Sequence, residues 1–203
     1  SMPATLSTGK LEVSENAIVQ NILNSGFSRV DILDSRTLSI ENGFEIPQAK
    51  SMELIGAGGT LSLNDNMTLS GTLKFSSPGI LNSGTVFLNG GLLDVEQDVS
   101  VSSAITHSVD STVDVSTGST LTLTGGDIDV GAKTLTLSGG GSVANQDQLI
   151  LNDPASILKL GGIASVKNVS MPATFSTGKL EVSENAIVQN LLNSGLSRVD
   201  IQD

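Results

Sequence analysis

The side chains best suited to nucleophilic chemistry lie around the single histidine of the chain. His107, Ser108 and Asp110 supply the three residue types of a catalytic triad. Neighbouring residues of a β-strand point to opposite faces, so these three side chains are not expected to converge on one substrate. The sequence also lacks the Gly-x-Ser-x-Gly motif that presents a serine nucleophile. We therefore predict that His107 is a surface residue and that this segment has no catalytic role.

A pair of carboxylates forms the second candidate site. Asp127 and Asp129 flank Ile128, so both side chains project from the same face of a strand. Such a pair could cleave a polysaccharide, but the sequence contains no Trp or Tyr to stack on sugar rings. Either this pair or the Asn-Asp-Asn loop at 64–66 could instead bind Ca²⁺, although the Gly-Gly-x-Gly-x-Asp motif of calcium β-rolls is matched only in part, at 125–129. We interpret these acids as solvated surface charge and predict no enzyme activity and no cofactor, with a bound calcium ion left open.

The composition narrows the classes of partner. The 203 residues include 10 Lys and Arg but 21 Asp and Glu, which gives a formal net charge of −11. That charge disfavours binding to nucleic acid and to anionic membrane surfaces, since both attract clustered cations. The absence of cysteine excludes disulfides, thiolate metal sites and a cysteine nucleophile. No run of 18 apolar residues is present, so the sequence predicts no membrane-spanning helix.

The chain repeats its first segment after an offset of 169 residues, because residues 1–34 recur as residues 170–203. The aligned pairs that differ are Leu6/Phe175, Ile22/Leu191, Phe27/Leu196 and Leu33/Gln202. Two interpretations are open: the chain is a window on a longer array of such units, or it is a complete protein whose first and last segments match. We favour the array, because the terminal repeats of a capped solenoid normally diverge in sequence. The predicted domains are one solenoid unit at 1–169 and the start of the next unit at 170–203.

Short apolar-x-apolar pairs dominate the unit and predict half-buried β-strands. Leu73/Phe75 and Leu135/Leu137 are examples, and clusters of Gly, Asn, Asp and Ser separate such pairs. Between 113 and 135, successive pairs begin seven or eight residues apart, so a three-sided coil takes about 20 residues. The predicted fold is all-β: a parallel β-helix (β-solenoid) with about 20 residues per coil and about eight coils per unit, rising about 40 Å along its axis.

Two segments fit this pattern less well. Residues 14–26 have the Ser start, the Gly stop and the Ile18/Ile22 spacing of a short helix, or they form a strand and a turn. We favour the strand because the segment continues directly into the alternating residues Val30–Ile32. Residues 41–58 show the weakest alternation, and we predict a lateral loop there.

The middle of the chain resembles known secreted solenoids. Residues 59–71 (GTLSLNDNMTLSG) and 134–145 (TLTLSGGGSVAN) resemble the passenger repeats of bacterial autotransporters and of filamentous-haemagglutinin-type adhesins. The resemblance extends over roughly residues 59–165 and lies in composition and spacing. It implies a right-handed parallel β-helix, secretion, and an extracellular or cell-surface role. The family has no invariant site residue to carry over.

These observations favour a structural protein. We predict an extracellular fibre or stalk in which 169-residue units stack end to end, so that the main partner of the chain is a further copy of itself. The alternative is an adhesin or binding module that recognises a glycan or another surface through the 41–58 loop. A polysaccharide-cleaving enzyme acting through His107, Asp127 and Asp129 is a third hypothesis, which the lack of convergence disfavours.

Overall fold

The computed structural model describes residues 4–6, 9–24, 27–82, 84–172, 178–193 and 198–202. Within these residues the chain forms 27 β-strands and no helix. The strands wind into about nine turns of a parallel β-solenoid with about 21 residues per turn. The predicted fold class is therefore confirmed, and the predicted coil length is close to the observed one.

The described strands belong to three sheets, and within each sheet the strands follow one another in the spatial order below. The ten-stranded sheet contains β2 (Lys10–Val13), β5 (Phe27–Ile32), β8 (Ser51–Ile55), β11 (Thr72–Phe75), β14 (Leu92–Val95), β17 (Ser111–Val115), β20 (Thr134–Ser138), β23 (Ile157–Gly161), β25 (Lys179–Ser183) and β27 (Arg198–Gln202). The eleven-stranded sheet contains β19 (Ile128–Asp129), β22 (Leu149–Ile150), β24 (Ser165–Met171), β21 (Ser142–Asn145), β18 (Thr120–Leu123), β15 (Val99–Val101), β12 (Gly79–Asn82), β9 (Gly59–Leu63), β6 (Thr37–Ile40) and β3 (Ala17–Val19), and β26 (Ile187–Asn193) pairs with β24. The six-stranded sheet contains β1 (Ala4–Leu6), β4 (Ile22–Asn24), β7 (Phe44–Ile46), β10 (Met67–Leu69), β13 (Thr85–Asn89) and β16 (Ala104–Val109).

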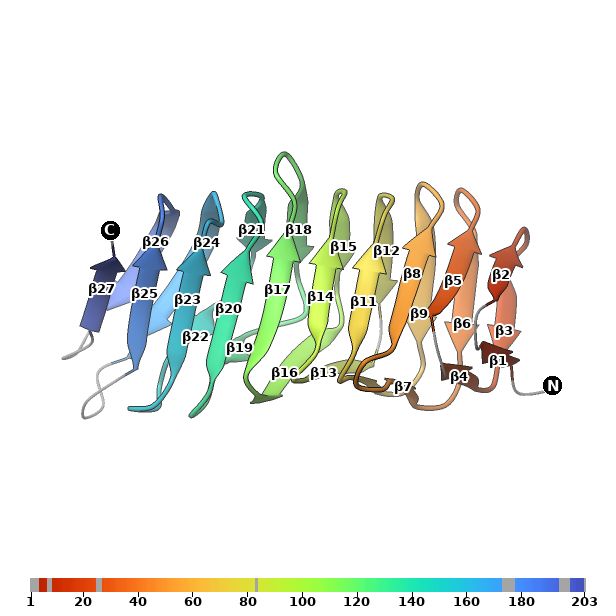
Figure 1. Cartoon of the computed structure of the whole chain (residues 1–203), viewed down its shortest axis with the longest axis horizontal. Helices are drawn as coiled ribbons and strands as arrows, with labels where there is room; N and C mark the ends of the chain where they lie inside the picture. Colours follow the sequence, from red (N-terminus) through yellow and green to blue (C-terminus); the bar gives the residue numbers. More distant parts are fainter. Residues whose placement is uncertain are drawn as a thin grey trace.

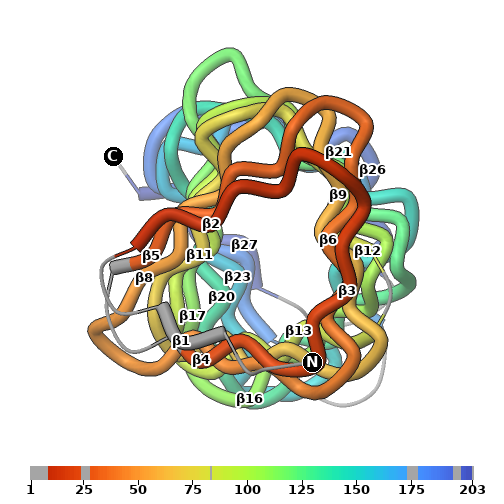
Figure 2. The backbone as a smooth tube through the Cα atoms, turned by 90° about the vertical axis from the view of Figure 1, so that its right-hand side faces the viewer, coloured from red at the N-terminus to blue at the C-terminus, as the bar shows by residue number. Residues whose placement is uncertain are grey.

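The three sheets form the sides of a tube, which Figure 2 shows from its N-terminal end. The ten-stranded and eleven-stranded sheets face each other, and the six-stranded sheet closes the third side over the N-terminal part of the tube (Figure 1). The strands pair in parallel from one turn to the next. Leu73, for instance, pairs with Met52 of the turn before and with Leu93 of the turn after. Backbone hydrogen bonds therefore run along the axis of the tube.

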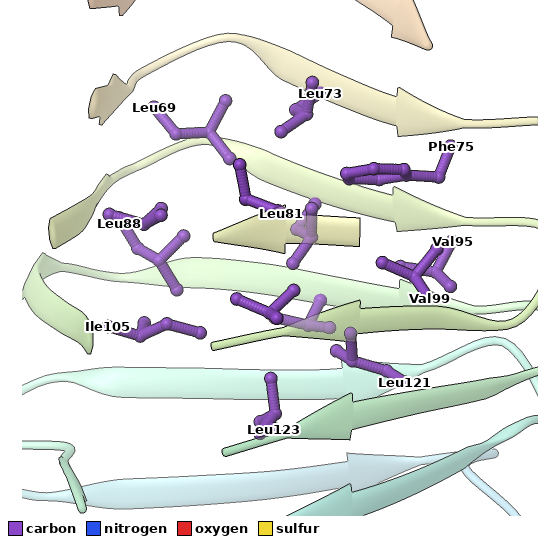
Figure 3. Packing of buried hydrophobic residues seen from close by; sticks show 14 of the residues in the cluster. Leu69, Leu73, Phe75, Leu81, Leu88, Val95, Val99, Ile105, Leu121 and Leu123 are labelled. Atoms are coloured by element: carbon purple, nitrogen blue, oxygen red, sulfur yellow. The ribbon is translucent and has the colours of Figure 1, made fainter. Parts of the chain in front are cut away.

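Aliphatic side chains fill the interior. In β11, Leu73 and Phe75 point inward and are buried, while Thr72 and Lys74 point outward. Leu, Val and Ile supply most of the buried core, as Figure 3 shows for the middle turns, and the described buried aromatic residues are Phe75 and Phe44. Inward side chains of successive turns pack on one another, so each turn covers the core of the turn before it.

The two segments with weak patterns both belong to the wall of the tube. In 14–26, β3 contains Ile18 and Val19, which confirms the predicted strand, and β4 is a second strand that ends at Asn24; the rest of the expected turn, residues 25 and 26, lies outside the described residues. The prediction of a lateral loop at 41–58 is wrong, because β7 and β8 lie in this segment and pair with strands of neighbouring turns. Phe44, Ile46 and Met52 are its inward residues and are buried. Two short alternating pieces suffice in this segment because the turns on both sides supply backbone partners.

The second copy repeats the strand pairing of the first in the ten-stranded sheet, whereas its residues 187–193 form one strand, β26, where the first copy has β3 and β4. β2 and its counterpart β25 lie eight steps apart in the ten-stranded sheet, so the 169-residue offset corresponds to eight turns. Lys10 pairs with Arg29 in the first copy, and Lys179 pairs with Arg198 in the second, which is the same register. At about 4.8 Å per turn, one unit rises about 38 Å along the axis.

Truncation of an inward side chain tests the core. Leu73→Ala is expected to lower the free energy of unfolding by about 2–5 kcal/mol, because the turns on either side hold the cavity open. Ile80→Ala, at an exposed position of β12, is the matched control and is expected to change it by less than about 1 kcal/mol. Chemical denaturation followed by circular dichroism measures both, and equal losses would contradict the assignment of inward and outward faces.

Candidate functional site

His107 lies in β16 and is half-buried, so the prediction of a surface position is wrong. Its Nδ1 lies 3.1 Å from the carbonyl oxygen of Val130 in the next turn, and its buried Nε2 has no hydrogen-bond partner among the described residues. Ser108 donates to an asparagine side chain of the previous turn, and Asp110 Oδ1 accepts from the backbone N–H of Thr134 at 2.8 Å. The three triad candidates therefore serve three separate hydrogen bonds and form no relay.

Asp127 and Asp129 are both exposed on the outside of the wall, as predicted. Asp127 Oδ1 accepts from the backbone N–H of Gln148 at 2.8 Å, and Asp129 Oδ1 accepts from that of Gly131 at 2.9 Å. Across the part of the chain that the structure describes, no group of three or more His, Asp or Glu side chains could hold a metal ion. The calcium hypothesis remains a prediction from the sequence, and the carboxylates act as hydrogen-bond acceptors.

Several Asp and Asn side chains clamp one turn to the next, a role that the sequence analysis missed. Asp98 Oδ1 accepts from the backbone N–H of Thr120 at 2.8 Å, and Asn16 Oδ1 accepts from that of Thr37 at 3.0 Å. Asp127 makes the equivalent bond. Each acceptor directly precedes a strand, and each donor lies 21 or 22 residues later. An Asp or Asn immediately before an apolar-x-apolar pair is the sequence signal that could have identified these clamps.

A ladder of asparagines joins the C-terminal turns. Asn145 Oδ1 accepts from the backbone N–H groups of Lys167 and Asn168 at 3.1 and 3.2 Å. Asn168 Nδ2 donates in return to the carbonyl oxygens of Asn145 and Gln146 at 2.9 and 2.8 Å. Asn190 continues the ladder by donating from Nδ2 to Asn168 Oδ1 at 2.9 Å. These amides satisfy buried backbone groups that would otherwise lack partners at the corner of the tube.

The outer face of the ten-stranded sheet carries ion pairs between turns. Lys10 Nζ contacts Glu12 of its own strand at 2.8 Å and Asp31 of the next turn at 3.0 Å. The second copy repeats this trio as Lys179, Glu181 and Asp200. Both copies of the repeat therefore present the same charges at the same places on the tube.

An ion pair joins Lys159 to Glu181 of the second copy of the repeated segment. Hydrogen bonding to Lys179 lowers the pKa of Glu181, and the charge of Lys159 from the previous turn, 3.5 Å away, lowers it further. Glu181 is buried, whereas its counterpart Glu12 is exposed, because no described turn precedes β2 on this face of the sheet. The second copy of the repeated segment is thus joined to the preceding turn by backbone pairing and by charge.

A groove of about 540 Å³ follows the corner between the six-stranded and ten-stranded sheets. Gly71 and Gly91 form its floor, where an added Cβ would lie 2.2 Å and 2.4 Å from backbone oxygens of the previous turn. Small and polar side chains line it, with Lys50 as its charged group. The groove therefore offers no convergent set of acids or nucleophiles.

The most informative surface is the end of the tube formed by the second copy of the repeat. Val30 and Ile32 of the first copy are 0% and 3% exposed, because the turn that contains β8 covers them. Their counterparts Val199 and Ile201 are 43% and 80% exposed, since in the described chain no turn follows β27. The same inward residues are therefore buried in one copy and open in the other.

Outward residues of the two copies provide an internal control. Ile18 and its counterpart Ile187 are 67% and 64% exposed, and Leu23 and Leu192 are 56% and 59% exposed. The exposed fractions of these outward side chains thus stay nearly the same in the two copies, whereas those of the inward residues Val199 and Ile201 are much larger than those of Val30 and Ile32. The difference arises because one copy has a following turn over it and the other does not.

No family model, no curated protein and no solved structure matches the chain. The assignment of a parallel β-solenoid is therefore based on the strand pairing of this chain. The resemblance to autotransporter and haemagglutinin-type repeats is supported at the level of fold alone. Among the described residues, no helix is long and apolar enough to cross a membrane.

Removal of a ladder amide tests the asparagine clamps. Asn145→Ala leaves two backbone N–H groups of the next turn without their acceptor, which is expected to cost about 1–3 kcal/mol for each group that stays buried. Hydrogen exchange should accelerate at the amides of Lys167 and Asn168 specifically. Asn89→Ala, which removes the exposed side-chain bonds that Asn89 donates to Ser70 and accepts from Ser108, is the control and should leave those amides unchanged.

The pH dependence of stability tests a pair of carboxylates that lie in register, Asp94 and Asp114. Burial raises the pKa of Asp94 above its ordinary range, and attraction to Lys74 offsets this only in part. The folded state therefore holds the Asp94 proton more tightly than the unfolded state, so ionisation of this group destabilises the fold at neutral pH and the effect is lost as the pH falls through the folded pKa.

Asp94→Asn is thus expected to raise the melting temperature at neutral pH and to match the wild type below the ordinary range of aspartate pKa values. Thermal unfolding at a series of pH values measures the difference. A lower melting temperature for the variant at neutral pH would mean that the attraction to Lys74 outweighs the burial of the carboxylate.

Proposed function

We propose that this chain is a structural, length-setting element: an extracellular stalk or fibre in which 169-residue solenoid units follow one another along a common axis. The exposure of the second copy is the observation that supports this most directly. Val199 and Ile201 are open at the end of the tube, and the same residues of the first copy are buried by a following turn. A continued stack would bury them in the same way.

The boundary between the units adds further support. β25 pairs with β23 of the first unit, and Lys159 and Glu181 form an ion pair across the boundary. A second unit thus follows the first with the backbone pairing, core and charges of an ordinary turn. Filaments arise when such a head-to-tail contact does not close into a ring.

The alternative function, an adhesin or glycan-binding module, keeps less support. Its binding site was expected in a lateral loop at 41–58, and that segment is part of the wall. The corner groove at Gly71 and Gly91 is one surface that a glycan could contact. Little supports the polysaccharide-cleaving hypothesis, because His107, Asp127 and Asp129 take part in separate structural hydrogen bonds.

The length of a two-unit protein tests the proposed function. A chain in which residues 1–169 are followed by residues 1–203 is expected to be longer than the 203-residue chain by about 38 Å, at an unchanged cross-section. Small-angle scattering and negative-stain electron microscopy measure both dimensions. Two separate rods joined by a bend, or a particle that grows in all directions, would contradict the continuous stack.

A further inference from the structure

The strands β26 and β27 form one end of the tube, which we call the C-terminal edge. Leu191, Val199 and Ile201 are its exposed inward residues. We propose that this edge is a docking surface for one particular turn, residues 35–56 of a further copy of the repeat. The inference rests on the proposed function and adds the partner, its register and the side chains that select it.

The first copy shows how the apolar residues of that turn fit the same sequence. Val30, the counterpart of Val199, pairs with Leu54. Ile32 is the counterpart of Ile201, the most exposed apolar residue of the edge. Gly56 lies directly over Ile32, and a Cβ added to Gly56 would be 1.9 Å from the carbonyl oxygen of Ile32. Gly56 has a φ of 111°, so both its conformation and this close approach require glycine. The docked turn therefore needs glycine at this point.

An asparagine supplies the polar part of the fit. In the first copy, Asn42 Nδ2 donates to Asn21 Oδ1 at 3.1 Å. Asn190, the counterpart of Asn21, already donates from its own Nδ2 to Asn168 Oδ1. In the second copy, Asn190 Oδ1 is thus the equivalent of Asn21 Oδ1, which accepts from Asn42 in the first copy. Docking of residues 35–56 extends the asparagine ladder across the junction without a break.

Charge also distinguishes this turn from others. Arg29 of the first copy lies in register with Glu53, and both are on the outer face of the ten-stranded sheet. Arg198 is the counterpart of Arg29 on the C-terminal edge. Docking of residues 35–56 therefore sets a glutamate beside Arg198, and opposite charges in register favour the pair.

Residues 57–78 form a matched turn for comparison. This turn has the same 22-residue length, and its strands β9, β10 and β11 enter the three sheets in the same order as β6, β7 and β8. Lys74 is in register with Glu53. The strands before and after Asn42, β6 and β7, each pair with residues that lie 23 positions later in the chain. Asp65 of the following turn therefore lies over Asn42. On the C-terminal edge this turn would set a lysine against an arginine and replace an amide donor with a carboxylate.

The test compares the 203-residue chain with two extended chains, in which either residues 35–56 or residues 57–78 follow Asp203. The sequence contains no cysteine, so Ile201→Cys introduces a single thiol at the exposed inward position. Residues 35–56 are expected to slow labelling of that thiol by a maleimide about tenfold or more and to slow amide exchange in β27. Residues 57–78 should protect it less. A thiol introduced by Ile187→Cys, on the outer face, should be labelled at the same rate in all three chains.

Two substitutions within the appended turn test whether its asparagine and its glutamate determine the protection. Asn42→Asp and Glu53→Lys, made together in the appended segment only, give residues 35–56 the two polar features of the control turn. They are expected to abolish most of the protection while circular dichroism shows that the preceding 203 residues stay folded. Retained protection would overturn the proposed role of the asparagine and the charge.

The outcomes separate this inference from the proposed function. Equal protection by both turns would overturn the selectivity and leave the continuous stack intact. No protection by residues 35–56, in a protein whose two-unit form still gains about 38 Å in length, would overturn the docking surface alone. Failure of the two-unit chain to lengthen would contradict the stalk itself.

Discussion

Backbone pairing between successive turns is the interaction on which the rest of this protein depends. A strand of a solenoid cannot satisfy its backbone N–H and C=O groups within its own turn, so each turn needs a neighbour on both sides. Core packing follows the same direction, since the inward side chains of one turn are covered by the next. This dependence explains why Ile32 is buried and Ile201 is open although the two residues belong to the same repeated sequence. It also makes the end of the tube the chemically distinctive surface.

Polar side chains reinforce the same axis. The aspartate and asparagine clamps, the ladder through Asn168 and lysine–carboxylate pairs such as Lys159 with Glu181 join residues about one turn apart. An acidic composition therefore has a structural use as well as an effect on solubility. The faces of the tube differ in charge: the ten-stranded sheet carries the ion pairs, whereas the outward residues of the eleven-stranded sheet from β6 to β21 are Thr, Ser, Ile, Asn and Ala. The ion pairs among the described residues thus lie on the side of the tube formed by the ten-stranded sheet.

In several segments the sequence pattern does not predict burial or the role of a side chain. Residues 41–58 alternate over only a few positions, and their burial depends on turns that lie before and after them in the chain. His107 is half-buried because Val130, 23 residues later, covers its ring nitrogen. Asp127 and Asp129 look like a catalytic pair when only their spacing is considered, and each proves to be an acceptor for a backbone amide. In these segments, contacts with neighbouring turns decide which residues are buried and which hydrogen bonds the side chains make.

The all-β class, the coil of about 20 residues and the eight-turn unit can be predicted from the amino-acid sequence alone, because alternation, turn residues and an offset of 169 residues are visible in one dimension. The folded chain was needed to establish which residues become neighbours one turn apart. The number of residues per turn varies from coil to coil, so partners such as Asn145 and Asn168 or Arg29 and Glu53 cannot be aligned by counting. Register between turns is a property of the stack, and the clamps, the ladder and the open edge all follow from it.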